Sequence, residues 1–450
     1  MPKFHIEFTD EVITNNTGLI LAASVLNSDN FRKAIEGANI FPNAEISDYD
    51  IIKSYVGLLC LGKNDYEAIE NYRGDELFKK AFEMDDVPSC STLRQRLELL
   101  STEKIQEAVK IFNIEMLKFC AVLQTCLEAQ FIPVDFDVTP FDNSRSKKEG
   151  SNHTYKHFDG YAPMMTYIGQ TGFMINNEMR EGKAHSNCEG TDKYIENTLQ
   201  YAGELTDQPL LCRFDSGNDS VSNMAVIDTF ENANYIIKKN FRREDQQQYI
   251  DIAQGAGCTI TKPRDGKETY INSNRVTLPY KDNATGEVKE VKTRIVVRYV
   301  VRTILANGQS LLMPQTELDA WYTDLDDKYT PENIEALYKD HGTSEQFHSE
   351  FKTDMDMERF PSGKFATNAL VLTLGMLAFN ILRAIGHETL NSGQLKRKRP
   401  IQRVRIRKVL QDIMYMACKL MVKYRRLTIQ FAYHNRYANA FIYAYARLNE

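Results

Sequence analysis

The feature that most constrains the fold is a change of pattern at Phe131. Residues 46–129 carry apolar side chains at helical spacing. The apolar run Phe131–Val134 then leads into the alternating stretch DFDVT, which has the period of a strand. The change predicts a helical N-terminal domain over residues 1–129 and the first strand of a new domain from residue 130.

Beyond this point strands lead and helices are interposed between them. The expected strands cover residues 161–169, 173–179, 210–215 and 235–238, and the expected helices cover about 191–204 and 220–231. This order predicts a mixed α/β sheet. We expect a catalytic domain formed by residues 130–240 and 320–390, with helices over about 331–355 and 364–390.

The segment between the two parts of this domain, residues 241–319, reads as β-rich. Its longest expected strand, Val288–Thr303, alternates apolar residues with basic ones. The pattern predicts one face in the core and one basic face; the basic residues are Lys292, Arg294, Arg298 and Arg302.

Positive charge also gathers near the end of the chain, although the formal net charge is −6. Residues 391–426 hold twelve Lys or Arg and the single acid Asp412. This imbalance favours phosphate contact over an ordinary solvated face. We therefore expect a helical basic C-terminal region over residues 391–450, with the strongest cluster at Lys396, Arg397, Lys398 and Arg399.

Two motifs at strand ends carry acids. In DFDVT, Asp135 and Asp137 are two residues apart, so both side chains point to one face of the strand. A further acid, Asp215, closes the apolar strand in LLCRFD. Because Mg²⁺ prefers one or two carboxylates together with water and phosphate oxygens, the two motifs together predict a metal site. Surface aspartates that cap the next element are the alternative interpretation.

The helix expected over residues 331–355 displays a polar stripe. Tyr338, His341, Glu345 and Lys352 lie at offsets −7, −4, 0 and +7 from Glu345, which fall within a narrow arc at 3.6 residues per turn. The helix also carries an apolar stripe, so periodicity alone leaves open which face looks inward. A solvated face is the alternative.

These residues resemble the DDE transposases of bacterial insertion sequences, a family with a ribonuclease H-like catalytic fold. A large branch of that family carries the pattern Y-x2-R-x3-E-x6-K. Tyr338, Glu345 and Lys352 match it with the spacing intact, and His341 stands where the family usually has Arg. The stretches DFDVTPFDNS, KHFDGYAP and RFDSGNDS look like the insertion-sequence thirteen-eighty group. The resemblance covers about residues 131–390 and extends to the N-terminal region through PSCSTLRQRL.

The resemblance implies that Asp137, Asp215 and Glu345 form the catalytic triad and hold two Mg²⁺ ions, with Mn²⁺ as an alternative. Asp137 is preferred over Asp135 because the family's first acid is followed, with one residue between, by Thr, here Thr139. The implied activity is binding of inverted-repeat ends, Mg²⁺-dependent strand cleavage and strand transfer. The implied partners are double-stranded DNA and, in the DNA complex, a second copy of the chain. The implied phosphate contacts are Tyr338, His341, Lys352 and the two basic sets above.

Two other functions remain open on the sequence. A phosphatase of the haloacid dehalogenase type would use Asp135 of D-x-D-x-T as its nucleophile. A transposase-derived DNA-binding protein would keep the acids without using them. Comparison of Mg²⁺-dependent DNA nicking with turnover of p-nitrophenyl phosphate separates these functions.

The expected location is the bacterial cytoplasm, in association with the nucleoid. Eight cysteines occur without a C-x-x-C pair, which is typical of free thiols in a reducing compartment. The longest apolar stretch, Ala369–Leu382, is shorter than a membrane span requires, so no membrane partner is expected. No glycine-rich nucleotide-binding loop is evident, so no nucleotide cofactor is expected.

Overall fold

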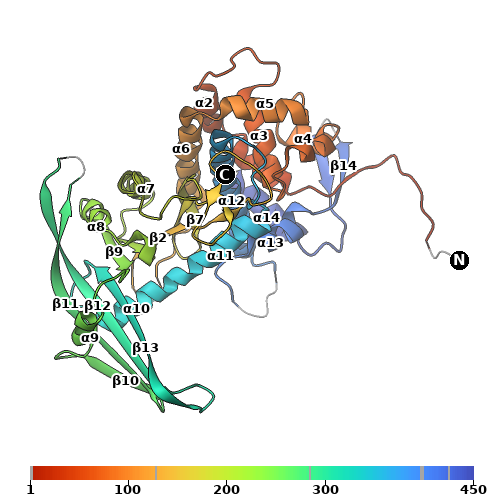
Figure 1. The fold of residues 1–450 in the computed structure, drawn as a ribbon. Helices are drawn as coiled ribbons and strands as arrows, with labels where there is room; N and C mark the ends of the chain where they lie inside the picture. The colour runs from red at the N-terminus through yellow and green to blue at the C-terminus, as the bar shows by residue number, and fades with distance from the viewer. Residues whose placement is uncertain (1–3, 127–128, 283–284, 396–399, 424–425, 450) are drawn as a thin grey trace. The chain divides into compact units, whose positions relative to one another are not determined.

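The computed structural model describes residues 4–126, 129–282, 285–395, 400–423 and 426–449 (Figure 1). The chain forms two compact units. Unit 1 contains residues 1–121, 141–151 and 348–450, and unit 2 contains residues 122–140 and 152–347. These units divide the chain at other places than the predicted domains, because residues from both ends of the chain share unit 1.

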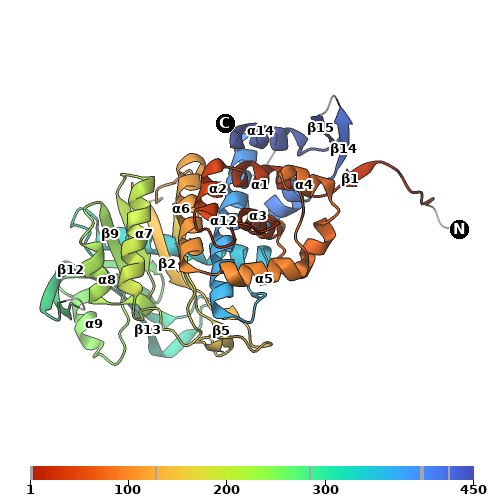
Figure 2. The same cartoon turned by 90° about the horizontal axis from the view of Figure 1, so that it is seen from above.

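Unit 1 is mainly helical. Its helix α12 (Phe365–Asn391) packs against α3 (Asp48–Leu59), α6 (Glu103–Cys120) and α14 (Ala438–Leu448), as Figure 2 shows. The other described helices of unit 1 are α1 (Leu19–Leu26), α2 (Asp29–Glu36), η1 (Tyr66–Tyr72), α4 (Glu76–Ala81), α5 (Cys90–Leu100), η4 (Glu350–Asp354), α13 (Ile406–Val409) and η5 (Leu410–Met414).

Helix α12 is long and apolar enough to cross a membrane by length and composition alone. It has 27 residues and is longer than the apolar stretch Ala369–Leu382, because small and polar residues extend the helix beyond that stretch. In its most apolar window 94% of the residues are buried inside the protein, as in the core helix of a soluble fold.

The C-terminal region of unit 1 is not purely helical, so that part of the prediction is wrong. Strands β14 (Cys418–Lys423) and β15 (Arg426–Gln430) form a hairpin, and β14 also pairs with β1 (Val12–Thr14). Alternation explains the strands: Cys418 and Leu420 are buried with Leu77 in a small core, as in a half-buried sheet. The short strand β3 (Phe141–Asp142) also belongs to this unit.

Unit 2 is built on a nine-stranded mixed sheet, which confirms the predicted mixed α/β class. The strand order is β10-β11-β12-β13-β9-β8-β2-β6-β7. Strands β2, β8 and β9 are parallel, and the other neighbours are antiparallel. The strand bounds are β2 Ile132–Val138, β6 Met164–Ile168, β7 Phe173–Glu178, β8 Leu210–Phe214, β9 Ala233–Lys238, β10 Thr259–Arg264, β11 Lys267–Lys281, β12 Val288–Ile304 and β13 Ser310–Thr323.

The β-rich segment adds to this sheet, because β13 pairs with β9 and carries β12, β11 and β10 with it in a long ribbon (Figure 1). Helices α7 (Thr191–Leu205), α8 (Val221–Ile227), α9 (Gln247–Ala253) and α10 (Pro331–Lys339) accompany the sheet. The remaining elements are β4 (Asn152–His153), β5 (Asp159–Tyr161), η2 (Ser216–Asn218), η3 (Asp340–Thr343) and α11 (Ser344–Ser349), which runs into unit 1.

The two faces of the sheet pack on different helices. On one face Phe136 of β2 stacks on Phe214 of β8 and meets Tyr194 of α7. On the other face the core includes Leu211 of β8 and Leu337 of α10. Side chains alternate along a strand, so Asp135, Asp137 and Arg213 point to the α10 face.

Candidate functional site

Asp137 and Asp215 lie side by side at the carboxyl ends of neighbouring strands. Parallel strands β2 and β8 pair Phe136 with Phe214, and each aspartate is the next residue of the chain, Asp137 within β2 and Asp215 directly after β8. The Asp215 carboxylate accepts hydrogen bonds from the Gly217 amide at 3.1 Å and from the Asn218 amide group at 2.9 Å. Burial and the negative charge of Asp137 raise the pKa of Asp215. Two carboxylates held close together at a strand edge are suited to a divalent cation.

Asp135 has a different environment from the two acids. Its side chain is 3% exposed, and Arg213 donates to both of its oxygens at 2.6 and 2.7 Å. Nδ1 of His341 lies 3.0 Å from Oδ1 of the same carboxylate. Burial would raise the pKa of Asp135, but the charges of Arg213 and His341 outweigh it and the pKa is lowered. Asp135 thus fixes the side chains of Arg213 and His341.

His341 is consequently a buried residue that contacts strand β2 through Asp135. It is 7% exposed, and burial lowers its pKa, but the hydrogen bond and charge of Asp135 dominate and the pKa is raised above its ordinary value. Arg213 also donates to the Leu337 carbonyl at 2.8 Å. The Asp135 pair therefore ties the end of α10 and the start of η3 to the strands that carry Asp137 and Asp215.

Two tyrosines surround the pair of acids. The ring of Tyr338 lies 5.7 Å from those of His341 and Trp321, and burial together with the charges of Asp215 and Asp137 raises its pKa. Tyr155 donates to the Val138 carbonyl at 3.2 Å. Burial and the same two charges raise its pKa to about 12.

The polar stripe does not lie on one regular helix, so that part of the prediction is wrong. Tyr338 is in the α-helix α10, His341 in the 3₁₀ segment η3, Glu345 in the six-residue α-helix α11 and Lys352 in the π-helical segment η4. A 3₁₀ segment has 3.0 residues per turn and a π segment closes i→i+5 hydrogen bonds. Both change the direction of the side chains that follow.

Glu345 is exposed and lies four residues after His341. Within the described ranges, no group of three or more His, Cys, Asp or Glu side chains is close enough to hold a metal ion. The structure therefore brings Asp137 and Asp215 together and does not add Glu345 to them. Lys352 lies in unit 1, where it pairs with Glu358 at 3.0 Å and its ammonium is 5.1 Å from the Phe141 ring centroid.

The chemistry of the donors nevertheless fits Mg²⁺. Both oxygens of an ionised carboxylate are hard ligands, and burial together with the charge of Asp137 raises the pKa of Asp215, an effect that a bound cation would oppose. Asp137 and Asp215 are the two residues at this sheet end that could hold it.

The basic strand face is largely neutralised. Arg298 pairs with Asp319 at 2.7 Å and Arg302 with Glu317 at 2.7 Å, both across the β12–β13 ladder. Lys292 is exposed. Arg294 is 3% exposed, and its guanidinium donates to the Tyr329 carbonyl at 2.7 Å, so the expectation of a surface contact is wrong for this residue. The centre of β12 is buried on both faces, and helices α8, α9 and α10 pack against this strand.

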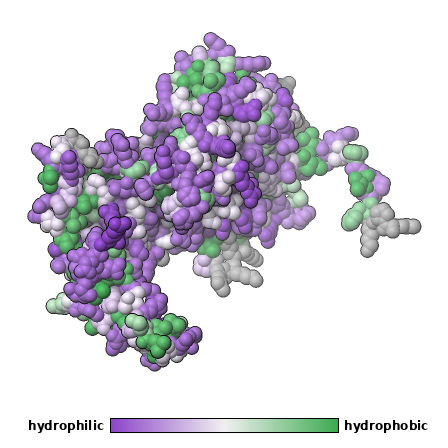
Figure 3. Space-filling view, viewed as in Figure 1, coloured by the Kyte–Doolittle hydropathy of each residue, from purple (hydrophilic) through white to green (hydrophobic). Residues whose placement is uncertain are grey.

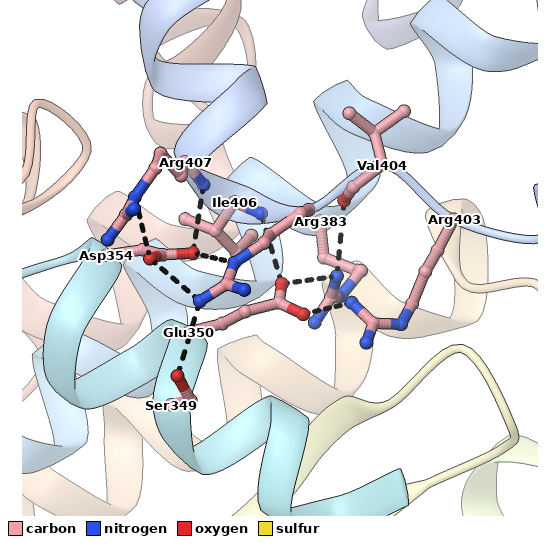
Figure 4. Close-up of polar contacts among 9 residues, drawn as sticks. Ser349, Glu350, Asp354, Arg383, Arg403, Val404, Ile406 and Arg407 are labelled. Carbon is pink, nitrogen blue, oxygen red and sulfur yellow. Dashed lines mark hydrogen bonds and ion pairs between the residues drawn. The ribbon is translucent and has the colours of Figure 1, made fainter.

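Part of the basic C-terminal segment is paired within unit 1. Glu350 is 1% exposed and accepts from Arg383 at 3.0 Å, from Arg403 and from the Ile406 amide at 3.0 Å (Figure 4). Asp354 accepts from Arg405 at 2.7 Å and lies 3.2 Å from Arg407. The predicted DNA contacts Lys396, Arg397, Lys398 and Arg399 lie outside the described residues.

Three important residues were missed in the sequence. The buried ion pair of Arg213 could have been predicted, because a lone arginine in the apolar strand LLCRF requires a buried anion. Tyr155 and Glu350 gave no such signal, since their partners come from other segments of the chain.

Comparison with known proteins gives one family match. The family model described as "Transposase DDE domain group 1" matches residues 1–450. No protein of curated function matches the chain. Among solved structures, a cryo-EM structure of a piggyBac transposase synaptic complex with hairpin DNA is similar at a TM-score of 0.42 and 11% identity. The match covers 89% of this chain and 80% of that chain.

Proposed function

Because the chain belongs to the transposase DDE domain group 1 family, we propose that it is a DNA transposase that cuts and joins DNA strands at the ends of its element. The observation that carries the proposal is the pair Asp137 and Asp215 at the ends of adjacent parallel strands. We assign the chain to the insertion-sequence thirteen-eighty branch of bacteria, with a ribonuclease H-like catalytic fold, on its sequence motifs.

In this proposal Asp137, Asp215 and Glu345 would hold two Mg²⁺ ions. When bound, such ions activate the attacking oxygen and stabilise the leaving oxygen of a phosphodiester. The reaction class is hydrolysis that frees a 3′-hydroxyl, followed by attack of that hydroxyl on a second phosphodiester. Glu345 would join the two aspartates when DNA and metal are present.

The chain's own residues orient this site. Gly217 and Asn218 fix the rotamer of Asp215 through hydrogen bonds to Oδ1. Asp135 contacts His341 of η3 and Arg213 contacts the Leu337 carbonyl of α10, so the two residues fix these elements against the strands that carry the acids. Tyr338, His341 and Lys352 are the proposed phosphate contacts, with Lys292 and the Lys396–Arg399 cluster further along the DNA.

The remaining proposals concern partners and place. Double-stranded DNA is the substrate, and two copies of the chain act together on it. The cytoplasm is the proposed location, in keeping with eight free cysteines. The phosphatase alternative is disfavoured, because both oxygens of Asp135 are engaged by Arg213 and the carboxylate is buried.

The test is Mg²⁺-dependent nicking of a duplex that carries the inverted repeats flanking the gene. Asp137→Asn, Asp215→Asn and Glu345→Gln should each abolish nicking and leave DNA affinity within about threefold. Lys33, an exposed residue of α2, provides the matched control Lys33→Gln, which should nick normally. Robust nicking by one of the acid variants removes that residue from the site. Turnover of p-nitrophenyl phosphate that depends on Asp135 alone would establish the phosphatase instead.

A further inference from the structure

The segment before β1 is an extended arm of unit 1 with three large apolar side chains in solvent. Phe4, Ile6 and Phe8 are 85%, 89% and 105% exposed. The arm runs away from the helices of unit 1 in Figure 1, and its hydrophobic surface is visible in Figure 3. Soluble proteins rarely leave contiguous apolar side chains uncovered unless they contact a partner.

The order of residues in the arm is that of a strand. Phe4, Ile6 and Phe8 alternate with His5 and Glu7, so an extended backbone places the apolar side chains on one face and the polar ones on the other. Such a segment is suited to β-addition, in which main-chain hydrogen bonds join it to an open sheet edge and alternate side chains give specificity.

The charge of the arm limits the kind of partner. Glu7, Asp10 and Glu11 outnumber the single basic residue, His5, in residues 4–11. An acidic arm is repelled by DNA phosphates and by anionic lipid headgroups. The partner is therefore a protein with an open strand edge and positive charge.

The chain itself offers such an edge. Strand β15 is the outer strand of the sheet β1-β14-β15, and within the described residues it pairs with β14 alone. Leu427 of β15 is 41% exposed, and Ile429 packs on the small core below. The five residues of β15 match the five residues from Phe4 to Phe8 in length.

Charge is complementary as well. Residues 413–449 contain no Asp or Glu, and their basic residues are Lys419, Lys423, Arg425, Arg426, Arg436 and Arg447. One contact of this kind already exists within the chain, where the Lys419 ammonium donates to Glu11.

We propose that the arm, residues 4–11, adds as a strand to the open edge of β15 in a second copy of the chain. Reciprocal exchange of the two arms gives a closed dimer with two-fold symmetry. Phe4, Ile6 and Phe8 then extend the apolar face of Leu427 and Ile429, and the acidic residues of the arm meet the basic C-terminal region. This pairing also covers an edge that would otherwise remain open to non-specific association.

Sedimentation velocity of the full chain without DNA tests the proposal. The wild type should be a dimer at about 50 μM and dissociate on dilution. The triple variant Phe4→Ser, Ile6→Ser, Phe8→Ser should dimerise at least tenfold more weakly, with an unchanged circular dichroism spectrum because those side chains are exposed. The matched control Leu312→Ser, Met313→Ser removes side chains that are 106% and 81% exposed in β13, and it should dimerise normally.

The receiving edge is tested with a labelled peptide of residues 1–11 added to the triple variant. The peptide should bind, and Leu427→Glu placed in the triple variant should weaken that binding at least tenfold. A wild type that is monomeric up to 50 μM, a triple variant that dimerises as well as the wild type, or peptide binding that is unaffected by Leu427→Glu would each overturn the proposal. None of these results depends on nuclease activity, so the proposed function stands or fails separately.

Discussion

Arg213 and Asp135 form a two-pronged ion pair across the parallel strands β8 and β2, with both side chains buried. The pair directly precedes the fully buried pair Phe136 and Phe214, and Asp137 and Asp215 are the residues that follow. It therefore lies two residues before the acids on the same face of the strands, and it connects this face to η3 through His341.

We expect Arg213→Leu to lower the free energy of unfolding by about 3–5 kcal/mol, because it leaves the Asp135 carboxylate buried with one fewer cation. Urea denaturation measures the loss. The double variant Asp135→Leu, Arg213→Leu is the control, and it should lose less than the single variant since no unpaired charge remains. A loss below about 1 kcal/mol for Arg213→Leu would show that the pair is not buried as described.

His341 gives a pH dependence of stability. Its pKa in the folded chain is raised above the ordinary value of about 6.5 by Asp135, despite the opposing effect of burial. Its contribution is therefore complete below about pH 6.5 and is lost as the pH rises through the folded pKa. The stability advantage of the wild type over His341→Gln should shrink as the pH rises from 6 to 9.

Two variants control this measurement, which uses urea denaturation at each pH. His341→Arg keeps its charge, so its free energy of unfolding should increase relative to that of the wild type as the pH rises. His434→Gln removes an exposed histidine and should match the wild type throughout. An equal pH dependence of the wild type and His341→Gln would contradict the role assigned to the Asp135 contact.

The salt dependence of DNA binding locates the phosphate contacts. Each lost contact should reduce the slope of log affinity against log salt by about one unit. Replacing Lys396, Arg397, Lys398 and Arg399 with Gln should flatten the slope by about three to four units. Arg405→Gln, Arg407→Gln should change it less, because Asp354 already neutralises those two side chains. An unchanged slope for the fourfold variant would move the contact to other residues.

The sequence predicted the parts of the fold that depend on local pattern. The strand ends at Asp137 and Asp215 and the long strand β12 follow from alternation and apolar runs. The strand order of the sheet, and hence the adjacency of the two acids, does not follow from such a pattern, because β6 and β7 lie between β2 and β8 in the chain but not in the sheet.

The errors have a common cause in partners that are distant in sequence. β14 forms a local hairpin with β15, but its other partner, β1, lies about 400 residues earlier. The basic pattern around Arg294 and Arg405 indicated exposed positive charge. Each side chain instead contacts a partner from another segment of the chain, which periodicity does not reveal. The single helix expected over residues 331–355 is interrupted by 3₁₀ and π segments, and no residue pattern in the sequence predicted them.

The last prediction concerns the repulsion between Asp215 and Asp137. Burial and the charge of Asp137 raise the pKa of Asp215, so the ionised carboxylate destabilises the folded chain at pH 7 when no metal is bound. In EDTA, Asp215→Asn should raise the free energy of unfolding by about 0.5–2 kcal/mol. The gain should shrink as the pH falls and the wild-type carboxyl becomes protonated.

With Mg²⁺ bound, the wild type should become more stable than Asp215→Asn. A cation bound by the two acids stabilises the wild type by about 2.7 kcal/mol at a hundred times its dissociation constant, and Asp215→Asn should not respond. Asp228→Asn is the matched control, because burial alone raises the pKa of that carboxyl. It should gain stability in EDTA and keep the full response to Mg²⁺. Thermal unfolding with and without Mg²⁺ measures both effects, and an equal Mg²⁺ response in the wild type and Asp215→Asn would show that Asp215 holds no metal.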